Sequence, residues 1–156
     1  MRASRIGRRI ASYAWAVPNT ALGLIAGLVV LALGGRVRVV CGTLEFSGGW
    51  LGTFVSSRPA SFSFVAITLG HVIVGVSESC LDAVRPHERV HVTQYEAWGP
   101  LFLPAYLASS CWQLVHRRHA YRDNFFEKQA CAGAPTLRVH PSAEGNAVGW
   151  NRSRAS

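Results

Sequence analysis

Charged residues are scarce in this chain. Only 15% of its 156 residues are Asp, Glu, Lys or Arg, whereas 49% are hydrophobic. This composition is poorer in charge than that of an average soluble domain and is typical of a protein that contacts a membrane. The length allows one domain.

Several motifs of other protein classes are absent. The sequence contains no Gly-Lys phosphate loop, no C2H2 zinc-finger spacing and no basic helix interleaved with aromatic residues. The net charge of +8 is scattered or flanks apolar segments, so contact with anionic lipid explains it better than nucleic acid does, and we expect no nucleic-acid partner. The four cysteines form no Cys-x-x-Cys pair. This excludes a zinc ribbon or thioredoxin-type centre and favours free thiols, although export would permit disulfides whose pairing the spacing leaves open.

An uncharged run extends from Ala14 to Leu33. Its length of about 20 residues is enough for a helix to cross a hydrocarbon layer of about 30 Å. Pro18 and Asn19 weaken its first turn, so a buried or interfacial helix is the alternative interpretation. Membrane lipid is therefore an expected partner.

Four arginines and no acidic residue precede this run, at positions 2, 5, 8 and 9. This bias keeps an N-terminus in the bacterial cytoplasm and predicts an uncleaved signal anchor. A cleaved signal ending near Ala32-Leu33-Gly34 and a twin-arginine export signal at Arg8-Arg9 are the alternatives.

The most informative motif is His87-Glu88-Arg89-Val90-His91, an H-E-x-x-H sequence. Its two histidines are about one helical turn apart, so both imidazoles can bind one zinc ion. Glu88 lies beside the metal in this arrangement, where a carboxylate can take a proton from zinc-bound water. The alternative is a surface helix with two unrelated histidines.

The surrounding residues predict a helix of about four turns. Ser79 or Asp82 can cap its N-terminus, Pro86 then falls in or near the first turn, and Gly99-Pro100 ends it. The histidines share one face with apolar residues, which is the arrangement a buried metal site needs.

A catalytic zinc usually has a third protein ligand and an open position for water. Glu127 is the best candidate, because Asp123 or Asn124 can cap a short helix that carries it. The small side chain of Ala130 would let that helix approach closely.

These residues resemble the gluzincin branch of the zincin metallopeptidases, in which a later helix supplies a ligand glutamate, often as E-x-x-A. More narrowly, the chain is similar to small membrane-associated bacterial proteins with an H-E-x-x-H-V-x-Q-Y core and a later N-x-x-E-x-x-A segment. The matching residues are His87, Glu88, His91, Val92, Gln94, Tyr95, Asn124, Glu127 and Ala130. The resemblance covers roughly residues 66–130 and implies a zinc peptidase with His87, His91 and Glu127 as ligands.

Other segments predict a small sheet. The run Ala66–Ile73 is rich in β-forming residues and is expected as one strand. The resemblance implies that this strand lies beside the motif helix, where it could pair with an extended substrate. Arg36–Val40 and Thr43–Ser47 are expected to form a hairpin around Cys41-Gly42, followed by a loosely defined stretch to Ala60.

A second apolar stretch, Leu101–Val115, is short for a full membrane crossing. If it crossed, the histidines and Glu127 would lie on opposite sides of the bilayer. We therefore expect a membrane-dipping or protein-buried helix that returns Glu127 to the side of the histidines, unless Glu127 is not a ligand.

Two further polar residues are secondary candidates. His71, on the expected strand, could help to polarise a substrate carbonyl, and a structural or exposed histidine is the alternative. Tyr121 could donate a hydrogen bond to an oxyanion, or could instead anchor the chain at a membrane interface.

Together these features predict an α+β fold: a minimal zincin-like domain, made of a small antiparallel sheet and the active-site helix, with an N-terminal transmembrane helix and a second short apolar helix. The expected segments are a basic N-terminus (1–13), the transmembrane helix or signal anchor (14–33), the zincin-like domain (34–131) and a disordered tail (132–156). The expected function is a zinc hydrolase of the bacterial inner membrane with a periplasmic catalytic part and a peptide or protein substrate. The alternative is a non-catalytic small membrane protein with a structural zinc or no metal.

Overall fold

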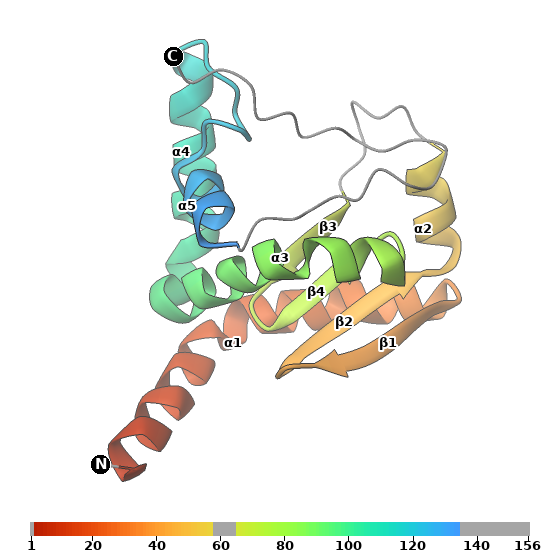
Figure 1. Cartoon of the computed structure of the whole chain (residues 1–156), viewed down its shortest axis with the longest axis horizontal. Coiled ribbons are helices and arrows are strands. Elements are labelled where there is room, and N and C mark those ends of the chain that lie inside the picture. The colour runs from red at the N-terminus through yellow and green to blue at the C-terminus, as the bar shows by residue number, and fades with distance from the viewer. Residues whose placement is uncertain (1, 58–64, 135–156) are drawn as a thin grey trace.

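The computed structural model describes residues 2–57 and 65–134. Its elements are α1 (Arg2–Ala32), β1 (Gly35–Val40), β2 (Thr43–Gly48), α2 (Gly49–Ser56), β3 (Ala66–Leu69), β4 (Val72–Gly75), α3 (Glu78–Trp98), the 3-10 turn η2 (Gly99–Leu101), α4 (Phe102–Val115) and α5 (Phe125–Gly133). A four-stranded sheet lies between α1 and α3, and α4 and α5 lie beyond one end of the sheet (Figure 1). The predicted α+β class is confirmed.

The sheet is mixed, so the prediction of an antiparallel sheet is wrong at its centre. Its strand order is β1-β2-β4-β3. The predicted β1–β2 hairpin is present, and Cys41 and Gly42 turn it with φ of 49° and 85°. β3 and β4 also pair antiparallel, but β2 and β4 run parallel. Residues 49–65 join the two hairpins and are long enough for the crossover that parallel strands require.

Two predicted segments need correction. The run Ala66–Ile73 is two strands rather than one, because Gly70, with φ of 62°, and His71 form a tight turn between β3 and β4. A single glycine within this run of mostly β-forming residues did not distinguish a tight turn from a continuous strand. The segment expected to be loose after Gly48-Gly49 contains α2, and residues 58–60 lie outside the described ranges.

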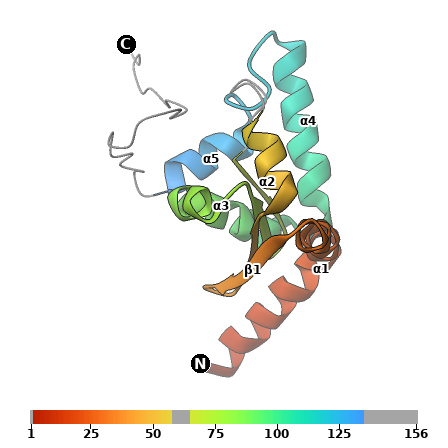
Figure 2. The same ribbon diagram turned by 90° about the vertical axis from the view of Figure 1, so that its right-hand side faces the viewer.

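β4 forms the centre of the core. All four of its residues are buried, because α1 covers one face of the sheet and α3 covers the other (Figure 2). Val72 and Val74 pack with Val30 of α1, whereas Ile73 packs with Leu81 of α3. Burial on both faces explains why β4 is a continuous apolar run rather than an alternating one.

α1 approaches the sheet closely through two glycines. A Cβ atom at Gly23 would lie 2.6 Å from the Cβ of Val72, and one at Gly27 would lie 2.5 Å from the Phe46 ring. α1 bends along its length (Figure 1), and it contains Pro18, which removes one helical hydrogen bond. The 22 residues from Ala11 to Ala32 are long and apolar enough to cross a membrane, a criterion that a signal sequence or a core helix also meets.

The motif helix α3 is longer than predicted. Its N-cap is Ser77, whose Oγ accepts a hydrogen bond from the Cys80 amide at 3.2 Å, so neither Ser79 nor Asp82 caps it. Pro86 therefore lies inside the helix rather than in its first turn. The predicted stop is confirmed, because α3 ends at Gly99, with φ of 54°.

α4 begins beside α1, where Asn19 Nδ2 donates a hydrogen bond to the Gly99 carbonyl at 2.7 Å. Asn19 therefore joins two elements. Of the α4 residues, all of which are described, only Phe102 is buried. The alternative of a protein-buried helix is therefore wrong.

α5 returns the chain toward the histidines, as the sequence predicted. Asn124 caps it by accepting a hydrogen bond from the Phe126 amide at 2.8 Å, and Asn124 Nδ2 donates to the Tyr106 carbonyl and to Ser110 Oγ of α4. α5 continues to Gly133, so residues 132 and 133 of the tail expected to be disordered are helical. Residues 135–156 of that tail lie outside the described ranges.

Candidate metal centre

Three side chains from two helices converge beside α4. His87 and His91 project from successive turns of α3, and Glu127 projects from the first turn of α5. His87 Nε2 lies 3.2 Å from Glu127 Oε2, His91 Nε2 lies 3.4 Å from Glu127 Oε1, and the two Nε2 atoms are 3.1 Å apart. The predicted trio is thus one cluster that could hold a metal ion.

The spacing of these atoms fits a small tetrahedral cation. Zinc bonds to imidazole nitrogen and carboxylate oxygen measure roughly 2.0–2.2 Å, which places neighbouring ligands of a tetrahedron about 3.3–3.6 Å apart. The three observed distances lie at or slightly below this range. Glu127 Oε2 is also buried without a well-aligned hydrogen bond, and a cation shared with His87 would satisfy it.

Neighbouring side chains orient two of these residues. His91 Nδ1 lies 2.8 Å from Gln94 Oε1, while Gln94 Nε2 donates to the Phe126 carbonyl at 3.1 Å. Because its amide nitrogen is used there, Gln94 presents an acceptor oxygen, which favours a proton on Nδ1 and leaves Nε2 with its lone pair toward the cluster. Tyr106 of α4 donates its hydroxyl proton to Glu127 Oε1 at 2.7 Å.

The cluster is electrostatically coupled. Burial lowers the pKa of His91, but the hydrogen bond with Glu127 and the charges of Glu127 and Glu88 outweigh burial and raise it. Burial raises the pKa of Glu127, but the contacts with His87 and His91 outweigh this and hold it well below its usual range. The carboxylate and an imidazolium therefore stabilise each other when no metal shares them.

Glu88 lies at the junction of α3 and the sheet. Its side chain is buried, and Thr68 Oγ1 of β3 donates a hydrogen bond to Glu88 Oε2 at 2.7 Å. The charge of Glu88 acts on His91, Tyr106 and Tyr121, so the carboxylate lies close to the cluster without belonging to it. The role of Glu88 as a general base stays a prediction.

The two secondary candidates lie in different places. Tyr121 lies between α4 and α5 and is 41% exposed, and partial burial first and then interactions with Glu127 raise its pKa. His71 lies in the β3–β4 turn rather than on a strand, where it stacks on Tyr13 with 3.9 Å between ring centroids and pairs with Glu96 at 3.1 Å. It lines a hollow of about 610 Å³ beside α1 and is not part of the cluster.

Sequence reasoning missed Tyr106 and Thr68 as neighbours of the site. Neither carries a local signal, because each reaches the site through contacts between elements far apart in the chain. Gln94 was recognisable from its position one turn after His91 and from the resemblance, although its role as a bridge to α5 was not.

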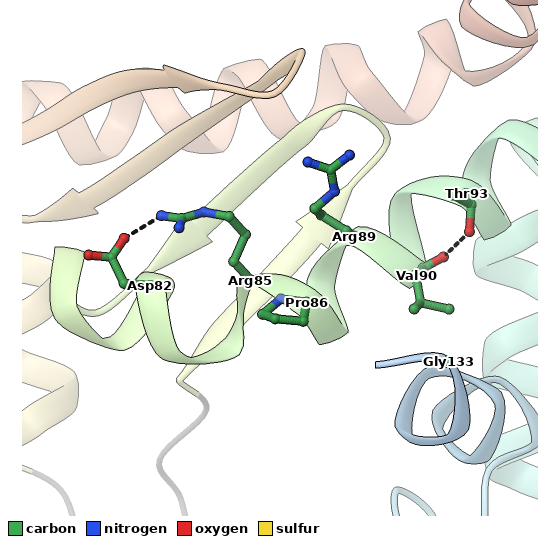
Figure 3. A pocket seen from close by; sticks show the side chains of 7 residues that line it. All are labelled: Asp82, Arg85, Pro86, Arg89, Val90, Thr93 and Gly133. Atoms are coloured by element: carbon green, nitrogen blue, oxygen red, sulfur yellow. Dashed lines mark hydrogen bonds and ion pairs between the residues drawn. The ribbon is translucent and has the colours of Figure 1, made fainter. Parts of the chain in front are cut away.

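A separate hollow of about 440 Å³ lies on another face of α3 (Figure 3). It is lined by Asp82, Arg85, Pro86, Arg89, Val90, Thr93 and Gly133. None of these residues belongs to the metal cluster, and Arg85 is already engaged by Glu45 and Asp82. The hollow is therefore distinct from the site.

No disulfide joins the four cysteines, all of which lie within the described ranges. Cys131 Sγ lies 4.0 Å from His87 Nδ1, on the side of that ring away from Glu127.

Comparison with protein-family models, curated proteins and solved structures gives no match to this chain.

The coupling of His91 and Glu127 predicts that the stability of the fold changes with pH in opposite directions with and without zinc. The raised pKa of His91 stabilises the metal-free fold below about pH 6.5, and this contribution is lost as pH rises through the folded pKa. The lowered pKa of Glu127 stabilises the metal-free fold above about pH 4.3, and this contribution is lost as pH falls through the folded pKa. Zinc binding instead strengthens as the imidazoles lose protons.

We therefore expect the free energy of unfolding of the chelated protein to fall between about pH 6 and pH 8, and that of the zinc-saturated protein to rise. Urea unfolding in mild detergent with EDTA or with excess zinc measures both slopes. Equal slopes in the two series would contradict the shared site.

Proposed function

We propose that the protein is a membrane-associated, zinc-dependent hydrolase of the gluzincin type that acts on a peptide or protein substrate. The observation that carries this proposal is the convergence of His87, His91 and Glu127 at spacings suited to zinc. Zinc accepts imidazole and carboxylate ligands, and three protein ligands leave a fourth position for water.

His87 and His91 would hold the ion through Nε2, and Glu127 through its carboxylate. When bound, zinc lowers the pKa of a coordinated water and polarises a carbonyl. Glu88 would accept the proton of the attacking water and later pass it to the leaving amine. The bond from Thr68 orients the Glu88 carboxylate, and Gln94 and Tyr106 fix the ligands in the same way.

Two features support a peptide substrate. Among the described residues β3 is an edge strand of the sheet, and it adjoins Glu88 through Thr68. An extended peptide could add to this edge by backbone hydrogen bonding. Tyr121 would then donate a hydrogen bond to the oxyanion that forms on the attacked carbonyl.

A structural zinc in a non-catalytic membrane protein is the second candidate. The low exposure of the ligand side chains favours it, at 13% for His87, 9% for His91 and 5% for Glu127, because a closed site binds metal without admitting substrate. α1 attaches the chain to the bacterial inner membrane in either case. The periplasmic position of the cluster stays a prediction.

The metal content of the full-length protein, purified in mild detergent and measured by elemental analysis, tests the zinc site. We expect near one zinc per chain in the wild type and in Glu88→Gln, which changes no ligand. His87→Ala and Glu127→Ala should each weaken zinc binding by at least about 100-fold, because each removes one of three ligands. A folded wild type without zinc would refute the proposal.

A further inference from the structure

One half of the circumference of α1 is exposed and apolar. Its exposed large side chains beyond Ala14 are Trp15, Val17, Leu22, Leu24, Ile25, Leu28 and Val29. No charged residue occurs from Ala14 to Ala32. At about 100° per residue these side chains share the side of the helix that faces away from the sheet. Soluble monomers rarely expose a continuous apolar surface of this extent.

α4 repeats this arrangement. Its outer positions and the adjoining end of η2 carry the exposed residues Leu101, Leu107, Trp112, Leu114 and Val115, and no charged residue occurs in the helix. The bond from Asn19 to Gly99 ties the start of α4 to α1. In Figure 2, α4 and the sheet-bound part of α1 both lie along the right-hand margin. Together their exposed apolar residues form one surface, which we call the α1/α4 surface.

The sheet prevents α1 from crossing a bilayer in this fold. Buried contacts with other elements extend from Ala16 to Val30, about 21 Å along the helix axis. A perpendicular α1 would therefore carry the sheet into the hydrocarbon layer. Arg36, with a side chain 84% exposed, would be immersed there together with the edge of β1. Exposed strand edges and exposed charged side chains are not stable in hydrocarbon.

Basic residues adjoin the α1/α4 surface. Arg117 and Arg118 are exposed immediately after α4, and the chain has a net charge of +8. Cations at the border of an apolar surface bind anionic lipid head groups. The positive charge of this chain attracts a leaflet that contains anionic lipid, whereas two copies of the basic chain would repel each other.

We propose that α1 lies in the plane of the membrane and that the α1/α4 surface is embedded in one leaflet. The chain is then attached to one side of the bilayer rather than anchored through it. Tyr106, which contacts Glu127, lies on the inner side of α4, so the metal cluster lies about one helix diameter, roughly 10 Å, from the lipid. The proposal does not depend on zinc binding.

Depth measurements distinguish a helix in the plane from one that crosses. Nitroxide labels are placed at Val17, Ile25 and Ala32, each as a single cysteine after the native cysteines are changed to serine. These exposed positions extend along about 22 Å of α1. The labelled protein is reconstituted with vesicles of phosphatidylcholine and phosphatidylglycerol, and accessibility to oxygen and to a nickel chelate gives each depth. Ala97→Cys, at an exposed position of α3, is the matched control.

We expect the three α1 labels at one shallow depth of about 5–10 Å and the Ala97→Cys label in water. A deep Ile25→Cys label between two shallow ones at opposite leaflets would show that α1 crosses the bilayer. Labels that remain in water, with a dimer by light scattering, would show that a second copy covers the surface. Either result overturns the proposal.

A charge substitution tests the same surface by affinity. Ile25 is 61% exposed, so Ile25→Lys leaves the core intact but puts a charge on the lipid side. Partition onto the same vesicles, measured by flotation, should fall at least about tenfold. Ala97→Lys adds the same charge on α3 and should leave partition unchanged. Equal behaviour of the two variants would contradict the proposal.

Discussion

Glu88→Gln is expected to abolish hydrolysis while the metal remains bound. The amide is nearly isosteric with the carboxylate, so Thr68 Oγ1 can still donate to its oxygen, as it does to Glu88 Oε2 at 2.7 Å. The amide cannot accept a proton from water, and loss of a positioned general base costs about 10²–10⁴-fold in rate. Cleavage of an unfolded protein such as casein, followed by fluorescence with zinc-loaded enzyme, measures the loss in kcat.

Glu78→Gln is a matched control on the same helix. Glu78 is in the first turn of α3, its side chain is 49% exposed, and it contacts Arg36 rather than the cluster. Its substitution should leave the rate unchanged. Full activity of Glu88→Gln would remove Glu88 from the mechanism, whereas zinc-loaded wild type that cleaves no substrate would favour the structural-zinc alternative.

The candidate site was predictable because its signals are local. The spacing of His87 and His91 follows from one helical turn, and the Asn124 cap located the short helix that carries Glu127. No local pattern joined these two helices. We linked the two helices because a catalytic zinc usually needs a third protein ligand. In the structure, Glu127 lies within 3.4 Å of both imidazoles.

The sheet was less predictable because its central pairing is not local. The β1–β2 hairpin followed from its turn residues, whereas the parallel pairing of β2 with β4 depends on the crossover of residues 49–65. Likewise, the apolar run of α1 predicted a transmembrane helix or signal anchor, but Gly23 and Gly27 gave no indication that one side would be covered by the sheet. The exposed half and the sheet-facing half of α1 are equally free of charge beyond Ala14, so hydropathy alone does not separate them.

A buried carboxylate on β2, that of Glu45, lies beneath α3 and is hydrogen-bonded to Arg85 of that helix. The Glu45 side chain on β2 is fully buried, between two guanidinium groups. Arg38 Nε donates to Glu45 Oε2 at 2.9 Å, and Arg85 Nε donates to Glu45 Oε1 at 2.7 Å. The hydrogen bond that Arg85 donates to Glu45 is also the main cause of the raised pKa of Arg85. Glu45 therefore fixes the strand that precedes the crossover to the helix that carries the metal ligands.

Glu45→Gln should destabilise the protein by about 1.5–3 kcal/mol, because it removes the buried anion that accepts from both arginines and leaves their guanidinium groups against a neutral amide, with only the exposed Asp82 still paired to them. Asp82→Asn is the matched control, since Asp82 contacts the same two arginines but its side chain is 55% exposed. Solvent screens that pair, so its loss should be a small fraction of the Glu45 effect. Urea unfolding in mild detergent, followed by circular dichroism, measures both. Similar midpoints for the two variants would show that Arg85 is held by exposed Asp82 instead, and that α3 docks on the sheet through Leu81 and Val92 alone.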